Sequence, residues 1–267
     1  MSTDRRRYPG FAASMFGAAL MLMLISNESR AQEPAASSAS PIASAFRSPD
    51  RLAGDSEEDE RRKAQDVLEF MGVAPGMHVL DYFAGGGYNT ELLSRIVGPG
   101  GSVIAYYSPA GAARSAGKTA QRFAGNRLAN AKQLVAGVND LQLAPGSLDG
   151  VLFVMAYHDL YHSPKDGAPP ANTGQITASL FEALKQGGVV IVVDHVANAS
   201  ANTIETVDAL HRIDPEVVKN DFTKAGFAFD SESTVLRNTT DDHTKPIMDP
   251  LVRYNTDRFV FRFRKPE

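Results

Sequence analysis

Segments that are apolar almost throughout alternate, over most of the chain, with segments whose apolar residues recur at helical spacing. Apolar runs of this kind are typical of strands in a parallel sheet, because helices cover both faces of such a sheet. The pattern therefore predicts an α/β fold. The expected strands lie at residues 77–82, 102–107, 133–136, 149–155 and 189–194, and the expected helices lie near 90–97, 110–124 and 173–185.

The pattern changes in the last third of the chain. Asp214 and Pro215 supply an N-cap and a first-turn proline for a helix that runs to about residue 225. Two segments with strand-like alternation follow, at 227–236 and 258–263. The polar loop between them, at 237–255, is long enough to form a lip over a substrate, and a simple surface excursion fits it equally well.

The N-terminal segment has the pattern of an export signal. Arg5–Arg7 precede an apolar run at 11–25 and small residues near Ala31, which is the order found in a signal peptide. The apolar run has about 15 residues, fewer than the ~20 that a membrane span needs. We therefore expect a signal peptide at 1–31, a periplasmic or secreted protein, and no stable membrane span.

A linker and a single domain are expected after the signal peptide. Residues 32–50 are rich in Ala, Ser and Pro, and this composition buries too little apolar area to offset chain entropy. We interpret 32–55 as a flexible linker. Order is expected from Ser56, which opens a capping-box pattern and an amphipathic helix that ends before Gly72. One domain is expected to cover 56–267.

Composition narrows the possible chemistry. A net charge of -4 provides no general basic field, so nucleic acid is not an expected partner, and small molecules or proteins are favoured. The chain contains no cysteine, which excludes disulfides, thiolate zinc sites and a cysteine nucleophile.

The densest chemical signal is the segment VLDYFAGGGYNT at residues 79–90. In it an apolar strand ends with the carboxylate Asp81, and three glycines, Gly85–Gly87, lead into a helix. Glycines at such a turn let the backbone approach a ligand closely and aim the amides of the next helix at it. Steric demands of a tight turn alone also call for glycine, so that simpler interpretation stays open beside ligand binding.

Taken with LKQGGVVIVVDH at 184–195, this segment resembles the class I S-adenosylmethionine (SAM)-dependent methyltransferases. The resemblance covers about residues 57–264. The segments AYHDLYH, LHRIDP and TDRFVFRFRKP are similar to a group of predicted exported bacterial members of that superfamily. The resemblance implies a Rossmann-like, mostly parallel seven-stranded sheet with helices on both faces and an antiparallel terminal hairpin.

The resemblance also implies a cofactor site. Asp81 and the glycine turn would line the methionine end of SAM, and Asp140 would lie on the adenine side. Two residues depart from the family pattern. Tyr107 stands where an acidic residue holds both ribose hydroxyls, and a phenol can make only one such hydrogen bond; Phe83 replaces the first glycine of the turn. The cofactor-binding candidates are Asp81, Ala84, Gly85, Gly86, Gly87, Tyr107, Asp140 and Tyr157.

A nicotinamide-dependent enzyme is disfavoured as an interpretation of the same turn. The glycines lack the G-x-G-x-x-G spacing, and no acidic residue ends the second strand.

A polar cluster, YHDLYH, follows the fourth expected strand, where parallel α/β sheets place their sites. His158 or His162 can be a general base, both can ligate a metal with Asp159, or all three can form a hydrogen-bonded rim. In the metal interpretation His195 or His211 could join them. We assign catalysis to His158, Asp159 and His162, and we assign no metal.

One cation near this cluster is a further candidate. Arg212 could receive an acidic group of a substrate, but an ion pair with Asp194 or Asp214 is the favoured role.

These observations lead to one leading hypothesis and one alternative. The leading hypothesis is a SAM-dependent methyltransferase that transfers a methyl group to an unidentified small-molecule or protein acceptor. The alternative is a periplasmic ligand-binding module that has kept the methyltransferase fold and lost the reaction, which the residues Phe83 and Tyr107 favour.

Overall fold

The computed structural model describes residues 39–163, 169–200 and 202–267. The predicted signal peptide, 1–31, lies outside these residues. None of the helices in the described part of the chain is long and apolar enough to cross a membrane.

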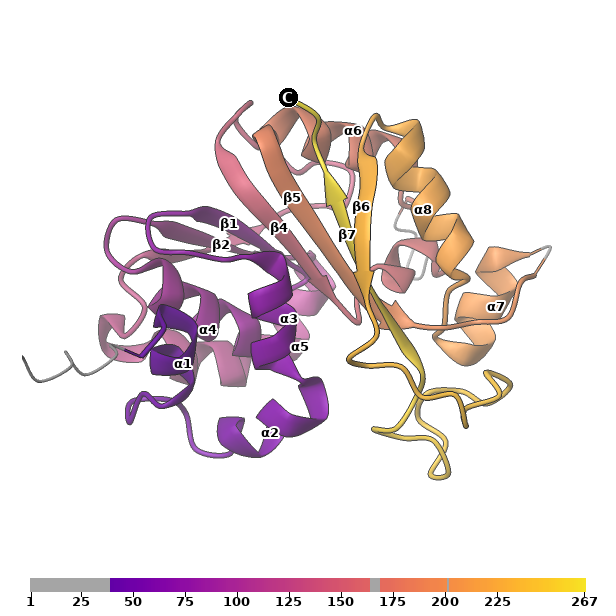
Figure 1. The fold of residues 1–267 in the computed structure, drawn as a ribbon, viewed down its shortest axis with the longest axis horizontal. Coiled ribbons are helices and arrows are strands. Elements are labelled where there is room, and N and C mark those ends of the chain that lie inside the picture. Colours follow the sequence, from indigo (N-terminus) through magenta and orange to yellow (C-terminus); the bar gives the residue numbers. More distant parts are fainter. Residues whose placement is uncertain (1–38, 164–168, 201) are drawn as a thin grey trace, which may run out of the picture. The chain divides into compact units, whose positions relative to one another are not determined.

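A seven-stranded sheet organises the described residues, with strand order β3-β2-β1-β4-β5-β7-β6 (Figure 1). Strands β1 to β5 run parallel, and β7 pairs antiparallel with both β5 and β6. The predicted mostly parallel sheet with an antiparallel terminal hairpin is therefore confirmed. The strands are β1 (His78–Tyr82), β2 (Ser102–Tyr107), β3 (Ala131–Val135), β4 (Leu148–Val154), β5 (Leu184–His195), β6 (Ala228–Ser233) and β7 (Arg258–Arg264).

Alternate residues of the central strands pack into two separate cores, one on each face of the sheet. Leu80 and Phe153 pack with helices α6 (Thr173–Ala183) and α8 (Pro215–Lys224). Their neighbours Val79 and Leu152 point the opposite way, into a core formed with the helices of the N-terminal half. Those helices are α1 (Pro41–Phe46), α3 (Ala64–Met71) and α4 (Tyr88–Val97) (Figure 1). Burial on both faces explains why the strands are apolar throughout.

The region expected to be a flexible linker is ordered from residue 39 onward. The side chain of Ser40 caps α1 by accepting a hydrogen bond from the Ala43 amide, and Pro41 occupies its first turn. Ile42 and Ala45 are buried in the core that α1 shares with α3 and α4. The linker prediction was therefore wrong for 39–55, because Ile42 and Ala45 are buried and Phe46 packs against the same core.

Three other elements differ from the sequence-based expectation. The single helix expected after Ser56 is two helices, α2 (Asp55–Arg62) and α3, separated at Lys63, whose φ of 44° is left-handed. Gly54, not Ser56, is the N-cap residue of α2. A further helix, α7 (Thr203–Leu210), lies in a stretch that the pattern left unassigned. The remaining helix of the parallel half is α5 (Pro109–Phe123).

Candidate functional site

A cavity of about 630 Å³ opens at the carboxyl ends of β1, β2 and β4. Its volume lies within the range of about 300–1,000 Å³ that is usual for small-molecule sites. The residues after β1 form one wall, the end of β2 and the start of α5 form a second, and the segment after β4 forms a third. The lining residues used below are Arg62, Asp81, Phe83, Ala84, Gly85, Gly86, Tyr107, Ser108, Arg114, Val138, Met155, Asp159, His162 and Ser163.

The glycine turn has the backbone shape that its sequence predicts. Gly85 and Gly87 have φ values of 55° and 75°, in the left-handed region that side chains disfavour. A Cβ atom at Gly87 would also lie 2.7 Å from Cδ of Arg122, too close for any real contact. The steric interpretation of these glycines is therefore correct for Gly87, while Gly85 and Gly86 line the cavity.

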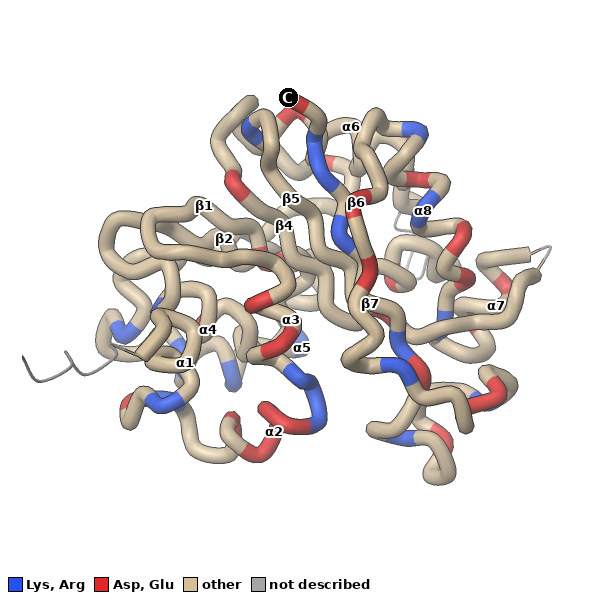
Figure 2. The backbone as a smooth tube through the Cα atoms, viewed as in Figure 1, with Lys and Arg blue, Asp and Glu red and all other residues tan. Residues whose placement is uncertain are grey.

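A buried arginine supports the turn from behind. Arg122 of α5 donates from Nε to the Gly86 carbonyl at 2.7 Å and from Nη1 to Asp55 at 2.7 Å and Glu91 at 2.5 Å. Asp55 belongs to α2, in which every residue but one is charged (Figure 2). Arg122 is thus a positioning residue for the turn, and it links the turn to α2 and α4.

Asp81 is the buried carboxylate at the end of the first strand. It is 2% exposed, and its Oδ2 accepts a hydrogen bond from Oγ1 of Thr90 at 2.5 Å. Burial raises the pKa of Asp81 to about 7, although the Thr90 hydrogen bonds and the charges of Arg122 and Arg62 oppose this rise. The carboxylate therefore lacks a full cationic partner among the described residues, and a cationic ligand group would supply one.

Tyr107 ends β2 and lines the same cavity. Its hydroxyl is buried and has no hydrogen-bond partner among the described residues. Buried hydroxyls are nearly always bonded, so an unpartnered one in a residue that lines a cavity is a candidate contact for a ligand atom. Burial, followed by the nearby charge of Asp81, raises the pKa of Tyr107, so the phenol is a neutral donor at physiological pH.

Two non-glycine residues at the cavity have strained backbones. Phe83 follows β1 with φ 54°, and Met155 follows β4 with φ 53°. Phe83, which stands at the first glycine position of the expected pattern, thus has a left-handed backbone. Strain of this kind costs of order 1–3 kcal/mol and clusters at functional sites.

Four of the predicted site residues lie outside the cavity lining. Gly87 faces Arg122, and the exposed Asp140 lies in a turn with its amide bonded to the Gly137 carbonyl at 3.0 Å. Tyr157 is buried in the core and donates to Asp221 at 2.8 Å. His158, 3% exposed, lies behind the wall. Val138, close to Asp140 in sequence, takes the position on the cavity wall.

The predicted catalytic residues gather around one carboxylate. His158 begins the short 3-10 helix η2 (His158–Tyr161), and His162 caps its end. Nε2 of each histidine lies 3.5 Å from Oδ1 of Asp159. Each Nδ1 atom is hydrogen-bonded to a second carboxylate. His158 Nδ1 lies 2.8 Å from Asp194 Oδ1, and His162 Nδ1 lies 2.9 Å from Asp208 Oδ1.

Two further histidine rings lie beside this pair. The ring of His211 is 4.5 Å from that of His162, and the ring of His195 is 6.1 Å from that of His158, between centroids. Topology explains the gathering, because the ends of β4 and β5 are adjacent and α7 packs against η2.

The charges inside the cluster are strongly coupled. Burial alone would lower the pKa of His158, but the adjacent Asp194 outweighs this effect and raises it to about 9. Burial lowers the pKa of His195 to about 3, so this ring is neutral. Burial would raise the pKa of Asp194, and the paired His158 outweighs burial and lowers it. The buried part of the cluster therefore holds a negative charge that favours a cation at His158.

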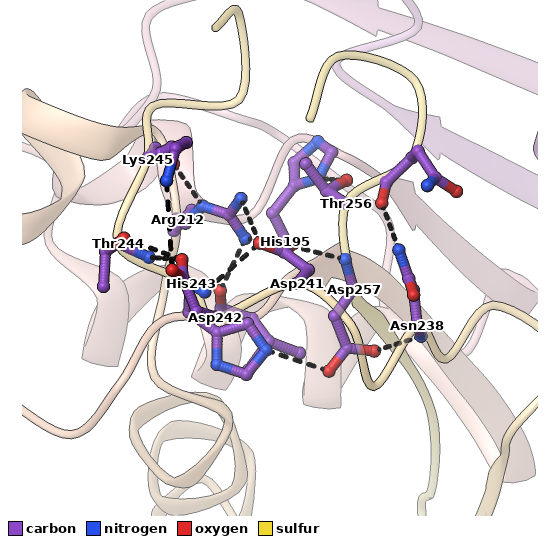
Figure 3. A network of polar contacts seen from close by, with 12 residues as sticks. His195, Arg212, Asn238, Asp241, Asp242, His243, Thr244, Lys245, Thr256 and Asp257 are labelled. Carbon is purple, nitrogen blue, oxygen red and sulfur yellow. Dashed lines mark hydrogen bonds and ion pairs between the residues drawn. The ribbon is translucent and has the colours of Figure 1, made fainter. Parts of the chain in front are cut away.

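Arg212 is committed to a structural ion pair. Its guanidinium donates to both carboxylate oxygens of Asp241, at 2.8 and 3.1 Å, and both side chains are buried (Figure 3). Its expected partners were Asp194 or Asp214, so that prediction was wrong about the partner and right about the ion pair. Asp241 belongs to the long loop before β7, and in the described chain no residue of 237–255 lines the cavity.

The same network holds the rest of this loop. Asp257 accepts hydrogen bonds from Arg237 at 2.8 Å and from the Asn238 amide at 2.8 Å, and it contacts His243 at 3.0 Å (Figure 3). The loop is thus a surface excursion that these contacts anchor at Arg237, Asn238 and His243.

Several residues that shape the site were not identified from the sequence. Arg122, Arg62, Arg114 and Asp208 lie in helices whose composition gives no signal of a site. Only the charge of Glu91 among the apolar residues of α4 could have indicated a buried ion pair.

Comparison with known proteins is consistent with the fold and the glycine turn. The model of the protein-L-isoaspartate(D-aspartate) O-methyltransferase family matches residues 60–129, which contain β1, the glycine turn, β2 and α5. This is about a quarter of the chain. No curated protein matches the sequence.

Solved structures match over most of the described domain. A SAM-dependent methyltransferase from Aquifex aeolicus aligns with TM-score 0.55 and 17% identity, over 78% of this chain and 92% of its own. A putative sarcosine dimethylglycine methyltransferase from Galdieria sulphuraria aligns with TM-score 0.54 and 14% identity, over 79% and 87%. The [4+2]-cyclase SpnF aligns with TM-score 0.54 and 15% identity, over 77% and 81%. The chain therefore has the fold of the class I SAM-dependent methyltransferases.

Proposed function

We propose that this protein is a SAM-dependent methyltransferase whose cofactor lies in the cavity at the carboxyl ends of β1 and β2. Tyr107 carries the proposal, because it lines the cavity and its buried hydroxyl has no partner among the described residues, so a ligand hydroxyl or ether atom could satisfy it. Tyr107 lines the same cavity as Asp81, which lacks a full cationic partner among the described residues, and as Gly85 and Gly86.

The chain's own residues would hold the cofactor in a defined orientation. Asp81 would accept from the ammonium group of the methionine part, and the glycine turn would let the backbone approach it closely. Tyr107 would donate one hydrogen bond to a ribose oxygen, in place of the two that a carboxylate accepts. When bound, SAM supplies an electrophilic methyl group, so the protein's main task is to align an acceptor with it.

The acceptor side of the cavity is formed by the segment after β4. Asp159, His162 and Ser163 line it, and Asp159 is the most exposed of the clustered carboxylates at 43%. Asp159 and His162 are within reach of a ligand proton, whereas His158 is buried and held by Asp194. The acceptor is therefore a nucleophile small enough, or protruding enough, to enter the cavity.

The cofactor assignment is tested by isothermal calorimetry on the purified full chain. SAM, S-adenosylhomocysteine and NAD are titrated separately, after mass spectrometry has checked for a co-purified nucleoside. Binding of SAM that is lost in Asp81→Ala and retained in Asp66→Ala, an exposed α3 carboxylate, is the expected result. Folded protein that binds no adenosyl ligand would refute the proposal.

A binding module without methyl transfer is the second candidate. Phe83 in a strained conformation and Tyr107 in the ribose position favour it, because both depart from the family pattern. The alignment with a [4+2]-cyclase also indicates that proteins with this fold differ in activity. SAM binding combined with no transfer from methyl-labelled SAM to any acceptor in a broad panel would support this candidate.

We also propose export to the periplasm, on the sequence of residues 1–31 alone. Expression of the full gene in a bacterial host, followed by mass spectrometry of the periplasmic fraction, should find a chain that begins near Gln32. An intact chain confined to the cytoplasm would refute export.

A further inference from the structure

We infer that His158, Asp159 and His162 form a binding site for one divalent transition-metal ion such as Zn²⁺, at the acceptor end of the cavity. The site goes beyond the proposed methyl transfer, because metal binding requires no SAM. Its suggested role, to hold an oxygen or nitrogen atom of the acceptor, rests on the proposed function.

The donor atoms of the three residues are spaced for a single ion. One donor atom from each of the three residues lies within 4.8 Å of the other two, and Oδ1 of Asp159 is 3.5 Å from both Nε2 atoms. Two ligand atoms on a tetrahedral zinc ion with bonds of about 2.1 Å stand roughly 3.4 Å apart. The carboxylate is thus already at ligand spacing from each ring, and only the two rings have to approach each other.

The two histidine rings are oriented toward the same carboxylate. His158 uses Nδ1 for buried Asp194, and His162 uses Nδ1 for Asp208, so each ring turns Nε2 toward Asp159. A carboxylate on the far nitrogen is the usual outer partner of a metal-binding histidine, because it fixes the tautomer and raises the basicity of the ligand. Two such pairs that converge on one carboxylate are more than a hydrogen-bonded rim requires.

The outer carboxylates are themselves held in place. Asp194 is fully buried and accepts from the backbone amides of His158 at 2.9 Å and His195 at 2.8 Å. Asp208 accepts from the amide of Ser163 at 3.0 Å. The rings are therefore fixed by two elements, β5 and α7, that are distant in sequence from η2.

The cluster is accessible from one side only, among the described residues. Asp159 and His162 line the cavity, while His158 closes the back at 4% side-chain exposure. Three protein ligands with an open coordination position are typical of catalytic rather than structural zinc sites. The open position would face the part of the cavity assigned to the acceptor, where a cation can bind and orient a carboxylate, hydroxyl or amine.

Charge is consistent with a bound cation. Asp159, Asp194 and Asp208 bring three carboxylates to two of the histidine rings. Protons on the rings and a metal ion are the two ways to balance this charge. Metal ligands must be deprotonated, so the two compete, and metal binding is measured at alkaline pH.

The experiment is a titration of the chelator-treated full chain with ZnCl₂ by isothermal calorimetry at pH 8, without SAM. Binding of one Zn²⁺ per chain is expected. Asp159→Asn and His162→Ala should each weaken it at least tenfold, and Asp208→Asn by about 10–100-fold as an outer partner. His78→Gln, at the opposite end of β1, is the matched control and should not change it.

A second readout keeps the test independent of folding defects. Circular dichroism checks that each variant is folded, and Asp159→Asn is nearly isosteric at an exposed position. CoCl₂ added to the wild type should produce visible absorption bands that Asp159→Asn loses. No saturable Zn²⁺ binding by the wild type, or binding that both Asp159→Asn and His162→Ala retain, would overturn the metal site and leave the hydrogen-bonded rim.

The result separates this inference from the proposed cofactor. SAM affinity is measured on the metal-free protein. If this protein does not bind SAM, the methyltransferase proposal is refuted, while the result of the zinc titration still stands. Conversely, a chain that binds SAM and no metal would refute only the metal site.

Discussion

The buried carboxylate of Asp81 should make the protein less stable as pH rises, and Asp81→Asn should remove that dependence. The pKa of Asp81 rises from 3.8 to about 7 in the folded chain, chiefly through burial. Folding therefore favours the protonated carboxyl. The stability that Asp81 contributes in this form is complete below about pH 3.8 and is lost progressively as pH rises to about 7.

The magnitude follows from the two pKa values. One pKa unit corresponds to 1.36 kcal/mol, so the fully ionised carboxylate costs the fold about 4 kcal/mol. At pH 5 only about 1.7 kcal/mol of this cost is present, because the folded protein still holds the proton. Asparagine carries no charge and can still accept the Thr90 hydrogen bond. The difference in unfolding free energy between Asp81→Asn and the wild type should therefore be about 2.5 kcal/mol larger, in favour of the variant, at pH 8 than at pH 5.

Urea denaturation of both proteins at pH 5, 6, 7 and 8 measures this difference. All other titrating groups are common to the two chains, so they cancel in the comparison, as does any pH-independent effect of the substitution. A stability difference that stays constant within about 0.5 kcal/mol across this range would show that Asp81 remains ionised throughout, and would refute the argument from its burial.

Three further predictions test the site and its frame. SAM affinity of the wild type should fall about tenfold from pH 8 to pH 6 by calorimetry as Asp81 becomes protonated, and a pH-independent affinity would argue against contact with that carboxylate. Tyr107→Phe should raise the melting temperature of the free protein, since it removes an unpartnered buried hydroxyl, and should weaken SAM binding about fivefold, equivalent to a hydrogen bond of about 1 kcal/mol. A variant in which the melting temperature and the SAM affinity both rise, or both fall, would refute the role assigned to Tyr107. Arg212→Leu should cost about 3–5 kcal/mol in urea denaturation because it leaves Asp241 buried without its partner, whereas Lys219→Leu, whose partner Glu216 is exposed, should cost under about 1 kcal/mol; equal costs would contradict the burial argument.

Local sequence patterns predicted most of the fold. The strand β2 was placed at its observed bounds, and α5, α8 and the terminal strands β6 and β7 lie within a few residues of their expected positions. Period-two and period-3.6 patterns are properties of neighbouring residues, so they survive without knowledge of the fold. Gly85 and Gly87 were also recognisable, because a left-handed backbone restricts the residue type directly.

Patterns failed where one or two side chains decide the structure. Helix α1 is held by Ile42 and Ala45 in a segment whose composition indicates a linker. The boundary between α2 and α3 lies at Lys63, where no proline or glycine indicates the end of a helix. In both places the energy comes from packing against distant elements, which no local window contains.

The sequence by itself determined the α/β class, the glycine turn after β1 and the gathering of His158, Asp159 and His162 after β4, because each depends on residues that are close together in the chain. Only the tertiary structure decided which of these residues meet a partner. Asp194 and Asp208 reach the two histidines across 36 and 46 residues, and Arg122 reaches Gly86 across 36. Burial of charged groups is a property of the whole packed domain. The raised pKa of Asp81 and the partners of the histidine rings therefore depend on how the sheet and its helices enclose these residues.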